Sequence, residues 1–206
     1  MNPFPESGTV YIVDDDASFL KSVARLLRSA GYNVQTFESA TAFLAQLGPE
    51  MSGCVLADLQ MPGLNGLELQ AALVRSSNPL PIVFLSAQRD IPATVKAMRH
   101  GAEDFLTKLC SKEDLLDAVR RALVRAAGED QHRRRFAQLS PRELEVLQQV
   151  VEGRLNKEIA DKLGINIRTV KLHRTNLTRK LGVQSVAELT RLAEASGWFQ
   201  AENRQV

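Results

Sequence analysis

The chain has 206 residues, of which 44% are hydrophobic and 24% are charged, a globular composition with room for one or two domains. No apolar run approaches the roughly 20 residues of a membrane span, and the amino terminus lacks the basic segment and apolar core of a signal peptide. These features argue against membrane and secreted proteins, so we expect a cytoplasmic protein whose two cysteines are free thiols.

The net charge of +2 is unevenly distributed. Residues 1–125 contain 12 basic and 14 acidic side chains, whereas residues 126–206 contain 14 basic and 10 acidic ones. Within residues 153–181 the count is 8 basic to 2 acidic. A local basic excess of this kind indicates a polyanionic partner for the C-terminal part of the chain.

Strand and helix patterns alternate through the first 125 residues. Short apolar runs predict strands over residues 10–13, 33–37, 54–58, 82–86 and 104–108. Amphipathic stretches predict helices over residues 18–30, 41–47, 67–75, 92–100 and 113–126. Five such repeats predict an α/β domain, residues 1–125, with a doubly wound, five-stranded parallel sheet of flavodoxin-like order 2-1-3-4-5.

The remaining residues show no strand pattern. Residues 126–138 are polar and charged, and they predict a linker. Residues 139–206 predict a small all-α domain, whose expected helices cover residues 141–152, 156–163, 167–181 and 185–195. Ser140, Pro141 and Glu143 have the spacing of a capping box with proline in the first turn.

Polar side chains follow four of the predicted strands. They are Asp14 and Asp15 after the first strand, Asp58 at the end of the third, Ser86 at the end of the fourth and Lys108 at the end of the fifth. Because the carboxyl ends of parallel strands meet at one edge, we expect these groups to converge there. Clustered carboxylates repel one another unless a cation is present, and Mg²⁺ prefers such oxygen ligands. The sequence therefore predicts a site for a divalent cation and a phosphoryl group, whereas Asp16 is expected to cap the following helix.

The segment 156–181 predicts a helix, a turn at Gly164 and a second helix. At about 100° per residue, one face of the second helix carries Val170, Leu177 and Leu181, which we expect in the core. The opposite face presents a mostly basic set of side chains: Arg168, Lys171, Leu172, Thr175 and Arg179. A solvated basic surface with one exposed leucine is the plainer interpretation, but the combination with a helix-turn-helix favours DNA binding.

These motifs resemble known families. The first half resembles the receiver domain of two-component response regulators, in the blocks Val13-Asp14-Asp15-Asp16, Asp58 with Met61-Pro62-Gly63, Ser86-Ala87 and Lys108. The second half resembles the LuxR/FixJ-type helix-turn-helix, in the blocks 139–143, 156–160, 168–174 and 180–183. Together they resemble transcriptional regulators of the FixJ/NarL class.

The receiver resemblance implies that Asp58 is the nucleophile that accepts phosphate from a sensor histidine kinase. It implies that Mg²⁺ is bound by Asp15, Asp58 and the backbone carbonyl of Gln60, with Asp14 acting through water. The protein would then switch between states and not turn over a substrate. Phosphorylation would also drive homodimerisation through residues 92–108, and RNA polymerase is a further candidate partner beside promoter DNA.

The same resemblance implies that Ser86 follows the phosphate and that Phe105 rotates inward behind it. One residue departs from the receiver pattern, because Leu109 stands where a proline with a cis bond usually follows Lys108. A cis bond before a non-proline residue costs about 3 kcal/mol, so we expect a trans bond here and a differently shaped loop.

The second helix of the helix-turn-helix is expected to enter the major groove of DNA. Lys171, Leu172 and Thr175 would face base edges. Phosphate contacts are expected from Asn156, Lys157, Arg168, Thr169, His173, Arg174, Asn176 and Arg179.

Two alternatives remain open from the sequence. Leu109 motivates a DNA-binding protein that works without phosphate and has a vestigial receiver. The pair Asp14 and Asp16 imitates the motif of phosphohydrolases with an aspartate nucleophile. Against the hydrolase, Ala17 and Ser18 follow where a Thr or Val is needed, and the late part of the chain is basic and lacks the further acidic residues.

Overall fold

The structure is a computed structural model, and it describes residues 8–76, 78–87 and 90–195. The chain divides into two compact units, with the boundary between Gly128 and Glu129. Within the described ranges, no helix is both long and apolar enough to cross a membrane.

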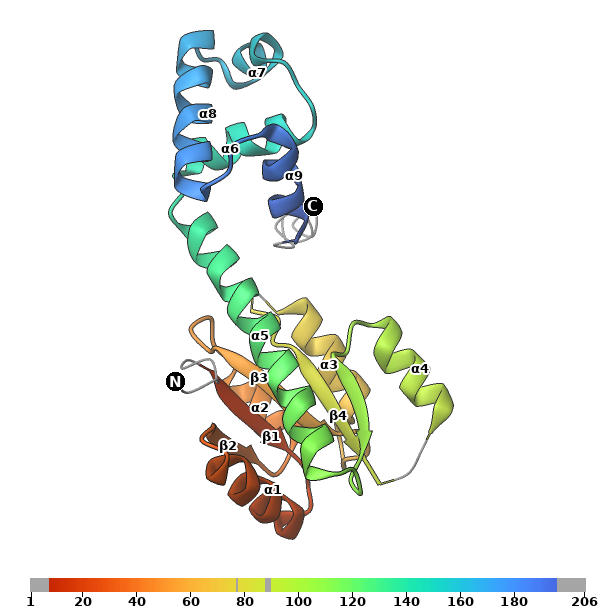
Figure 1. The fold of residues 1–206 in the computed structure, drawn as a ribbon. Helices are drawn as coiled ribbons and strands as arrows, with labels where there is room; N and C mark the ends of the chain where they lie inside the picture. The colour runs from red at the N-terminus through yellow and green to blue at the C-terminus, as the bar shows by residue number, and fades with distance from the viewer. Residues whose placement is uncertain (1–7, 77, 88–89, 196–206) are drawn as a thin grey trace. The chain divides into compact units, whose positions relative to one another are not determined.

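The N-terminal unit is built on a five-stranded parallel sheet (Figure 1). Its strands are β1 (Thr9–Val13), β2 (Asn33–Phe37), β3 (Gly53–Asp58), β4 (Ile82–Ser86) and β5 (Asp104–Thr107). They are ordered β2-β1-β3-β4-β5, and every neighbouring pair is parallel. The expected fold and strand order are therefore confirmed.

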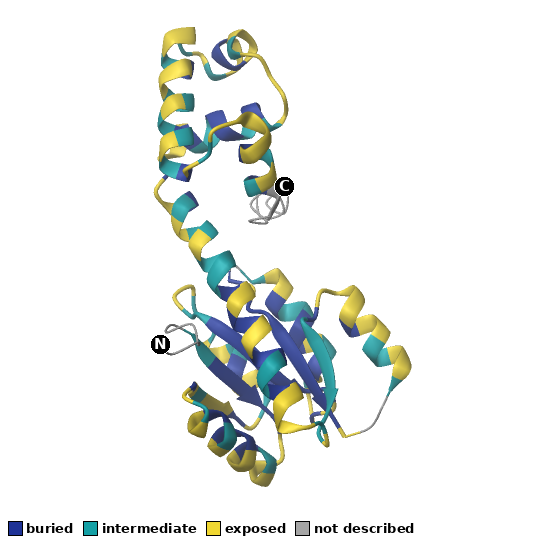
Figure 2. Cartoon of the chain, viewed as in Figure 1, coloured by how far each residue is buried: buried dark blue, intermediate teal, exposed yellow. Residues whose placement is uncertain are grey.

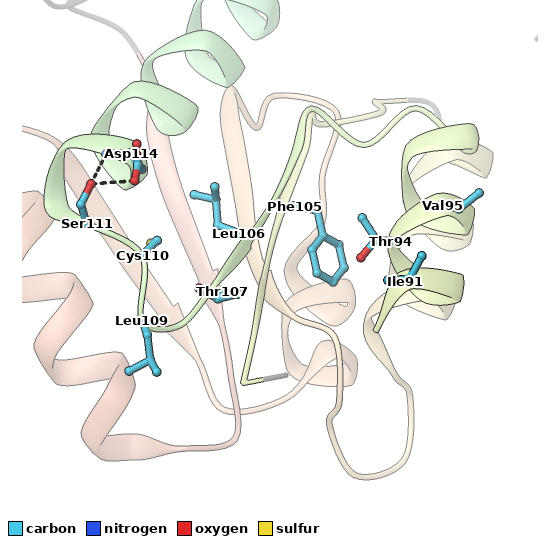
Figure 3. A pocket seen from close by; sticks show the side chains of 10 residues that line it. All are labelled: Ile91, Thr94, Val95, Phe105, Leu106, Thr107, Leu109, Cys110, Ser111 and Asp114. Carbon is cyan, nitrogen blue, oxygen red and sulfur yellow. Dashed lines mark hydrogen bonds between the residues drawn. The ribbon is translucent and has the colours of Figure 1, made fainter. Parts of the chain in front are cut away.

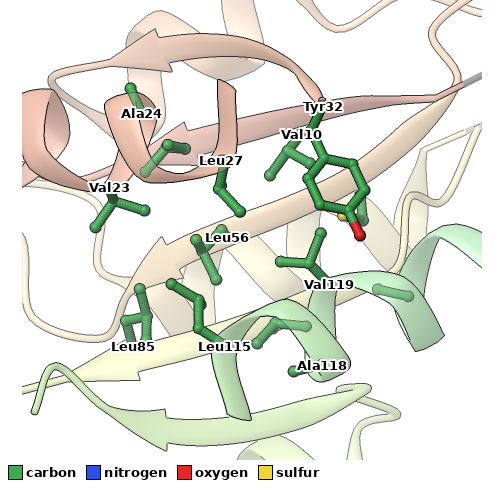
Figure 4. Close-up of a cluster of buried hydrophobic side chains, with 14 of the residues drawn as sticks. Val10, Val23, Ala24, Leu27, Tyr32, Leu56, Leu85, Leu115, Ala118 and Val119 are labelled. Carbon is green, nitrogen blue, oxygen red and sulfur yellow. The ribbon is translucent and has the colours of Figure 1, made fainter. Parts of the chain in front are cut away.

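Helices cover both faces of this sheet. They are α1 (Ala17–Ser29), α2 (Ala40–Gln46), α3 (Gly66–Arg75), α4 (Ile91–Arg99) and α5 (Lys112–Ala137). Successive strand residues alternate between the faces. Val10 and Ile12 pack with α1 and α5, whereas Tyr11 and Val13 pack with α2, α3 and α4. Figure 4 shows the first of these two apolar layers, and Figure 2 shows that the central strands are buried.

Gly66 brings the start of α3 close to the end of β3. A Cβ atom at this position would lie 2.5 Å from the carbonyl oxygen of Asp58 and 2.9 Å from both Leu59 and Phe84. The Gly66 N–H also donates to the carbonyl of Leu59, at 3.0 Å. The position of the Asp58 backbone therefore depends on a residue without a side chain at 66.

Helix α5 continues well beyond its expected end at Ala126. It runs to Ala137, so the residues expected to form a linker are helical as far as that position. Asp130 forms ion pairs with Arg133 and Arg134, which lie one helical turn further along α5. Phe136 is buried in the core of the C-terminal unit. The polar composition of this stretch fits a solvated helix as well as a linker, and only Phe136 supplies an apolar anchor.

The C-terminal unit is helical, as expected. After the end of α5 it contains α6 (Pro141–Val151), α7 (Asn156–Leu163), α8 (Ile167–Leu181) and α9 (Val186–Ala195). Ser140 and Glu143 form the expected capping box at the start of α6. Gly164 ends α7 with φ 64°, which supplies the left-handed turn of a helix-turn-helix. Val170, Leu177 and Leu181 are fully buried, so their assignment to the core is confirmed.

Replacing Gly66 with Ala is expected to destabilise the N-terminal unit by about 1–3 kcal/mol, because the new methyl group overlaps backbone. Gly128→Ala is a matched control, since a Cβ at that helical position meets no atom within 4 Å. It should stabilise α5 by about 1 kcal/mol. Native-state hydrogen exchange of β3 and α5 amides measures both effects. Equal effects of the two substitutions would contradict this account of Gly66.

Candidate functional site

The carboxyl ends of β1 and β3 bring three acidic side chains together. Oxygen atoms of Asp14, Asp15 and Asp58 all lie within 4.8 Å of one another. Asp14 and Asp58 are buried, whereas Asp15 is exposed. Three carboxylates are hard oxygen donors, and one of them is open to solvent, so this set fits a divalent cation such as Mg²⁺.

Lys108 lies beside the two buried carboxylates. Its Nζ atom is 2.6 Å from Asp14 Oδ2 and 2.9 Å from Asp58 Oδ2. Burial would lower the pKa of Lys108, but the hydrogen bonds to both carboxylates outweigh burial and raise it. Burial raises the pKa of Asp14, and the hydrogen bond from Lys108 opposes this effect only in part. The positive charge of the Lys108 ammonium thus stabilises the charged form of the two carboxylates, which burial alone disfavours.

Backbone N–H groups orient the same carboxylates. Gln60 N donates to Asp58 Oδ1 at 3.2 Å, and Asp16 N donates to Asp14 Oδ1 at 2.9 Å. The side chain of Asp16 accepts from the N–H groups of Ser18 and Phe19 at the start of α1. The assignment of Asp16 as a helix cap is confirmed, and Asp16 is absent from the group that can hold a metal among the described residues.

The ends of β4 and β5 complete the site. Ser86 is buried, and its backbone carbonyl accepts the N–H of Lys108 at 2.8 Å. This bond fixes the backbone of Lys108 at the strand end. The described residues contain no cis peptide bond, so the expected trans bond between Lys108 and Leu109 is confirmed. Leu109 is 92% exposed.

Phe105 lies between the sheet and α4. Its ring centroid is 6.0 Å from that of Phe84, and its side chain lines a pocket of about 580 Å³ that also includes Thr94 of α4 (Figure 3). The ring is half-buried. The pocket leaves open space beside the ring.

Sequence reasoning missed one contact in this site. The ring of Phe19, in the first turn of α1, lies with its centroid 4.5 Å from Lys108 Nζ. Phe19 belongs to the apolar spacing of α1 and is half-buried against the layer between α1 and α5. Nothing in that spacing distinguishes a core aromatic from one that faces an ammonium group 89 positions later.

The basic face of α8 is accessible, as expected. Its five members, Arg168, Lys171, Leu172, Thr175 and Arg179, are all exposed. Lys157 at the start of α7 is also exposed. The hydroxyl of Thr175 donates to the carbonyl of Lys171 at 3.1 Å, which leaves its methyl group and its lone pairs for other contacts.

The other expected phosphate contacts are half-buried: Asn156, Thr169, His173, Arg174 and Asn176. Arg174 donates from Nη1 to Asn156 Oδ1 at 2.7 Å, so two of them contact each other across α7 and α8. The Nδ1 atom of His173 is buried without a hydrogen-bond partner, which leaves only Nε2 for any contact outside the protein. The contact between Arg174 and Asn156 joins α8 to α7, which helical spacing did not reveal.

A half-buried ion pair joins the start of α6 to the end of α8. Lys180 Nζ lies 2.7 Å from Glu143 Oε2 and donates to the carbonyl of Gln138 at 3.0 Å. Sequence reasoning assigned Glu143 to the capping box alone. Lys180 stands in the last turn of α8, and no local pattern links it to α6.

A parallel 2-1-3-4-5 sheet with an acidic strand-end cluster and a lysine, followed by a helix-turn-helix, defines a signalling receiver joined to a DNA-binding module. Residues 10–120 match the response regulator receiver domain, and residues 137–193 match the bacterial regulatory proteins of the luxR family. The chain therefore belongs to the response regulators with a LuxR-type DNA-binding domain, which regulate transcription.

Relatives share this organisation over nearly their whole length. The response regulator protein TmoT of Ectopseudomonas mendocina is 41% identical over 196 residues, which are 92% of this chain and 89% of TmoT. The transcriptional regulatory protein FixJ of Bradyrhizobium diazoefficiens is 39% identical over 197 residues, which cover 92% and 96%. Both relatives are regulatory proteins.

Solved structures agree. The response regulator StyR is 45% identical with a TM-score of 0.57, over 91% of this chain and 98% of StyR. Full-length FixJ from B. japonicum is 37% identical with a TM-score of 0.56, over 94% and 99%. The response regulator RcsB in complex with DNA is 26% identical with a TM-score of 0.52, over 92% and 99%.

The ion pair of Glu143 should make the stability of the C-terminal unit depend on pH. Burial alone would raise the pKa of Glu143, but the hydrogen bonds from Lys180 and Ser140 outweigh it and hold that pKa below its usual range. Such a carboxylate stabilises the fold above its unfolded pKa of about 4.3, and the stabilisation is lost as pH falls through the lower folded pKa.

Glu143→Gln is therefore expected to destabilise the C-terminal unit by about 1–3 kcal/mol at neutral pH. The difference from the wild type should shrink below about pH 4. Glu145→Gln is the control, because its pair with Arg142 is exposed and contributes at most about 1 kcal/mol. Hydrogen exchange of α6 amides across pH measures both. A Glu143→Gln effect that persists unchanged at pH 3 contradicts the assignment.

Proposed function

We propose that Asp58 accepts a phosphoryl group from a sensor histidine kinase and that this event controls promoter binding by the C-terminal unit. The observation that carries the proposal is the surroundings of Asp58. Its carboxylate is 7% exposed, shares an ammonium with Asp14, and lies in a cluster with Asp15 that fits a cation. We further propose that residues 1–125 act as the receiver and residues 139–206 as the DNA reader, in the cytoplasm.

In this mechanism Asp58 attacks phosphorus. The bond between phosphorus and the donor's histidine nitrogen breaks as the bond to a carboxylate oxygen forms. Asp15, Asp58 and the Gln60 carbonyl are the proposed ligands of Mg²⁺, with Asp14 acting through water. The cation supplies charge neutralisation for the attacking carboxylate and the incoming group. We propose that the chain phosphorylates itself in this way and slowly loses the phosphate. We propose no multi-turnover activity for it.

The donors for the phosphoryl oxygens are already near the acceptor. Lys108 contacts Asp58 directly, and the backbone bond from Lys108 N to Ser86 O ties the two donors together. A phosphoryl group on Asp58 would take over the Lys108 ammonium and attract the Ser86 hydroxyl. We propose that the ring of Phe105 then rotates inward behind Ser86, which changes the surface formed by α4 and β5.

That surface is the proposed dimer contact. Three apolar side chains on α4 are exposed at one-turn spacings: Ile91, Val95 and Met98. An exposed apolar stripe favours association with a second surface. We propose that phosphorylation makes residues 92–108 self-complementary, so that two copies pair and present two reader units to DNA.

For the reader, we propose that α8 enters the major groove. Lys171, Leu172 and Thr175 lie on the exposed face and would contact base edges. The remaining basic members of that face, Arg168 and Arg179, would contact phosphates. We propose further phosphate contacts for Lys157 and, through their outer atoms, for the half-buried set Asn156, Thr169, His173, Arg174 and Asn176. Contact with RNA polymerase stays a prediction.

Acetyl phosphate with Mg²⁺ should add one phosphate to the wild type and none to Asp58→Asn, as measured by intact mass. Asp15→Asn keeps the shape but removes a charged ligand, so it should take up phosphate more slowly, and excess chelator should stop the reaction in the wild type. Full labelling of Asp58→Asn would show a different acceptor. A wild type that takes up no phosphate would favour a vestigial receiver.

A stable phosphate mimic, beryllofluoride, should convert the wild type from monomer to dimer in light scattering. Val95→Lys should prevent dimerisation by placing a charge in the α4 stripe. Val74→Lys is the matched control, because Val74 on α3 is 47% exposed and Val95 is 45% exposed. A wild type that stays monomeric at every concentration, or an equal loss in both variants, contradicts the proposed surface.

Lys171→Ala should cost roughly 1–3 kcal/mol on a selected DNA site and relax the preference at one base pair. Arg179→Ala should weaken binding to all sequences alike and reduce the salt slope by about one charge. Titrations on selected and random DNA across a salt series separate the two roles. If Lys171→Ala loses affinity equally on both DNAs, Lys171 contacts phosphate and the face assignment is wrong.

A further inference from the structure

The Lys108 ammonium has a third partner besides its two carboxylates. The ring of Phe19 faces it, with 4.5 Å between Nζ and the ring centroid. The side chain of Lys108 is only 16% exposed. A cation over an aromatic face is attracted by the ring quadrupole, and the attraction is larger where water is excluded. The contact is therefore of the stronger kind.

The position of Phe19 is fixed by the acidic stretch that it follows. Asp16 Oδ1 accepts from Phe19 N at 3.1 Å, and Asp16 N donates to Asp14 Oδ1 at 2.9 Å. Asp14 in turn contacts Lys108. The contacts thus run from Phe19 through Asp16 and Asp14 to Lys108, and from Lys108 back to the ring of Phe19. In this arrangement the helix cap places the aromatic ring against the ammonium. The ring also packs against the apolar layer between α1 and α5.

A bound divalent cation would compete for the other two contacts of the ammonium but not for this one. Asp14 and Asp58 belong to the group that can hold a metal, so a bound cation competes with Lys108 for their oxygens and repels its charge. The Phe19 ring is neutral and is not a metal ligand. Leu109 is 92% exposed, so it adds no packing that would hold the Lys108 loop in place. Among the described contacts of the ammonium, the one with the ring involves no candidate metal ligand.

We propose that Phe19 is a positioning residue that keeps the Lys108 ammonium over the strand-end site while a divalent cation is bound. This inference rests on the proposed phosphoryl transfer to Asp58, since the ammonium must be present to receive the phosphoryl oxygens. Phe19 acts through Lys108 and touches neither the acceptor nor the transferred group.

A matched pair of substitutions tests the ring face. Phe19→Leu keeps an apolar side chain in the α1 layer but removes the aromatic face, whereas Phe19→Tyr keeps the face. In the full, unphosphorylated chain, the ring shields the Lys108 ε-methylene and ammonium protons, which shifts their NMR signals upfield. Tyr should retain this shift and Leu should lose it, with and without Mg²⁺. Melting curves of all three proteins identify any loss of folding.

Phosphorylation by acetyl phosphate at saturating Mg²⁺ gives the second readout. Phe19→Leu should react about three- to twentyfold more slowly than the wild type, which is the range expected for a shielded cation–π contact. Phe19→Tyr should stay within about twofold of the wild type. A Leu variant as fast as the wild type, or a Tyr variant as slow as Leu, overturns the proposal.

The two failures are distinguishable. If the wild type takes up no phosphate, the proposed function fails, and the NMR comparison alone decides whether Phe19 holds Lys108. If the wild type is phosphorylated and the Leu variant matches it in rate, the proposed function stands and the role of Phe19 is wrong. An unshifted Lys108 signal in the wild type overturns the contact itself.

Discussion

The ion pair between Lys108 and the two buried carboxylates is the interaction on which the receiver site depends. Asp14 and Asp58 come from different strands, and both are buried at the same sheet edge. Without the ammonium, two like charges in this position would repel each other. The same ammonium sits where a phosphoryl group on Asp58 would need a positive partner. One side chain therefore stabilises the resting site and is available for the phosphorylated one.

The sheet explains how such a site is connected to a surface. Ser86 and Phe105 lie on adjacent strands, β4 and β5, whose backbones are hydrogen-bonded side by side. Lys108 follows β5 and is tied to Ser86 by its N–H. We propose that a change at Asp58 reaches Phe105 through these two neighbouring strand ends. A switch of this kind needs two discrete arrangements of a packed element, and the pocket around Phe105 offers the space for a second one.

Much of this could be predicted from the sequence, because the strong signals are local. Apolar runs that end in Asp14, Asp58 and Lys108 predict both the strands and their shared edge. The course of α5 could not be predicted in this way, since Phe136 is the one large apolar residue of its last part and its partners lie in another segment. Contacts between side chains far apart in the sequence could not be predicted either.

These long-range contacts are made by side chains that share no common sequence pattern. Lys180 forms an ion pair with Glu143 across the C-terminal core, and Arg174 on α8 donates a hydrogen bond to Asn156 on α7. Helical spacing orders the residues of one helix by face, but it does not say which neighbours a half-buried polar residue meets. The exposed face of α8 was predictable because exposure follows directly from that spacing.

We propose that phosphate on Asp58 controls the affinity of the chain for DNA. This control is tested most directly by titrating one selected DNA site with the full chain, with and without beryllofluoride, at a fixed salt concentration. Asp58→Asn serves as the control that cannot respond. The account predicts binding tighter by about 5- to 150-fold for the wild type with the mimic, the usual range of coupling between two sites, and no change for the variant. Equal affinity of the wild type in both conditions would contradict it.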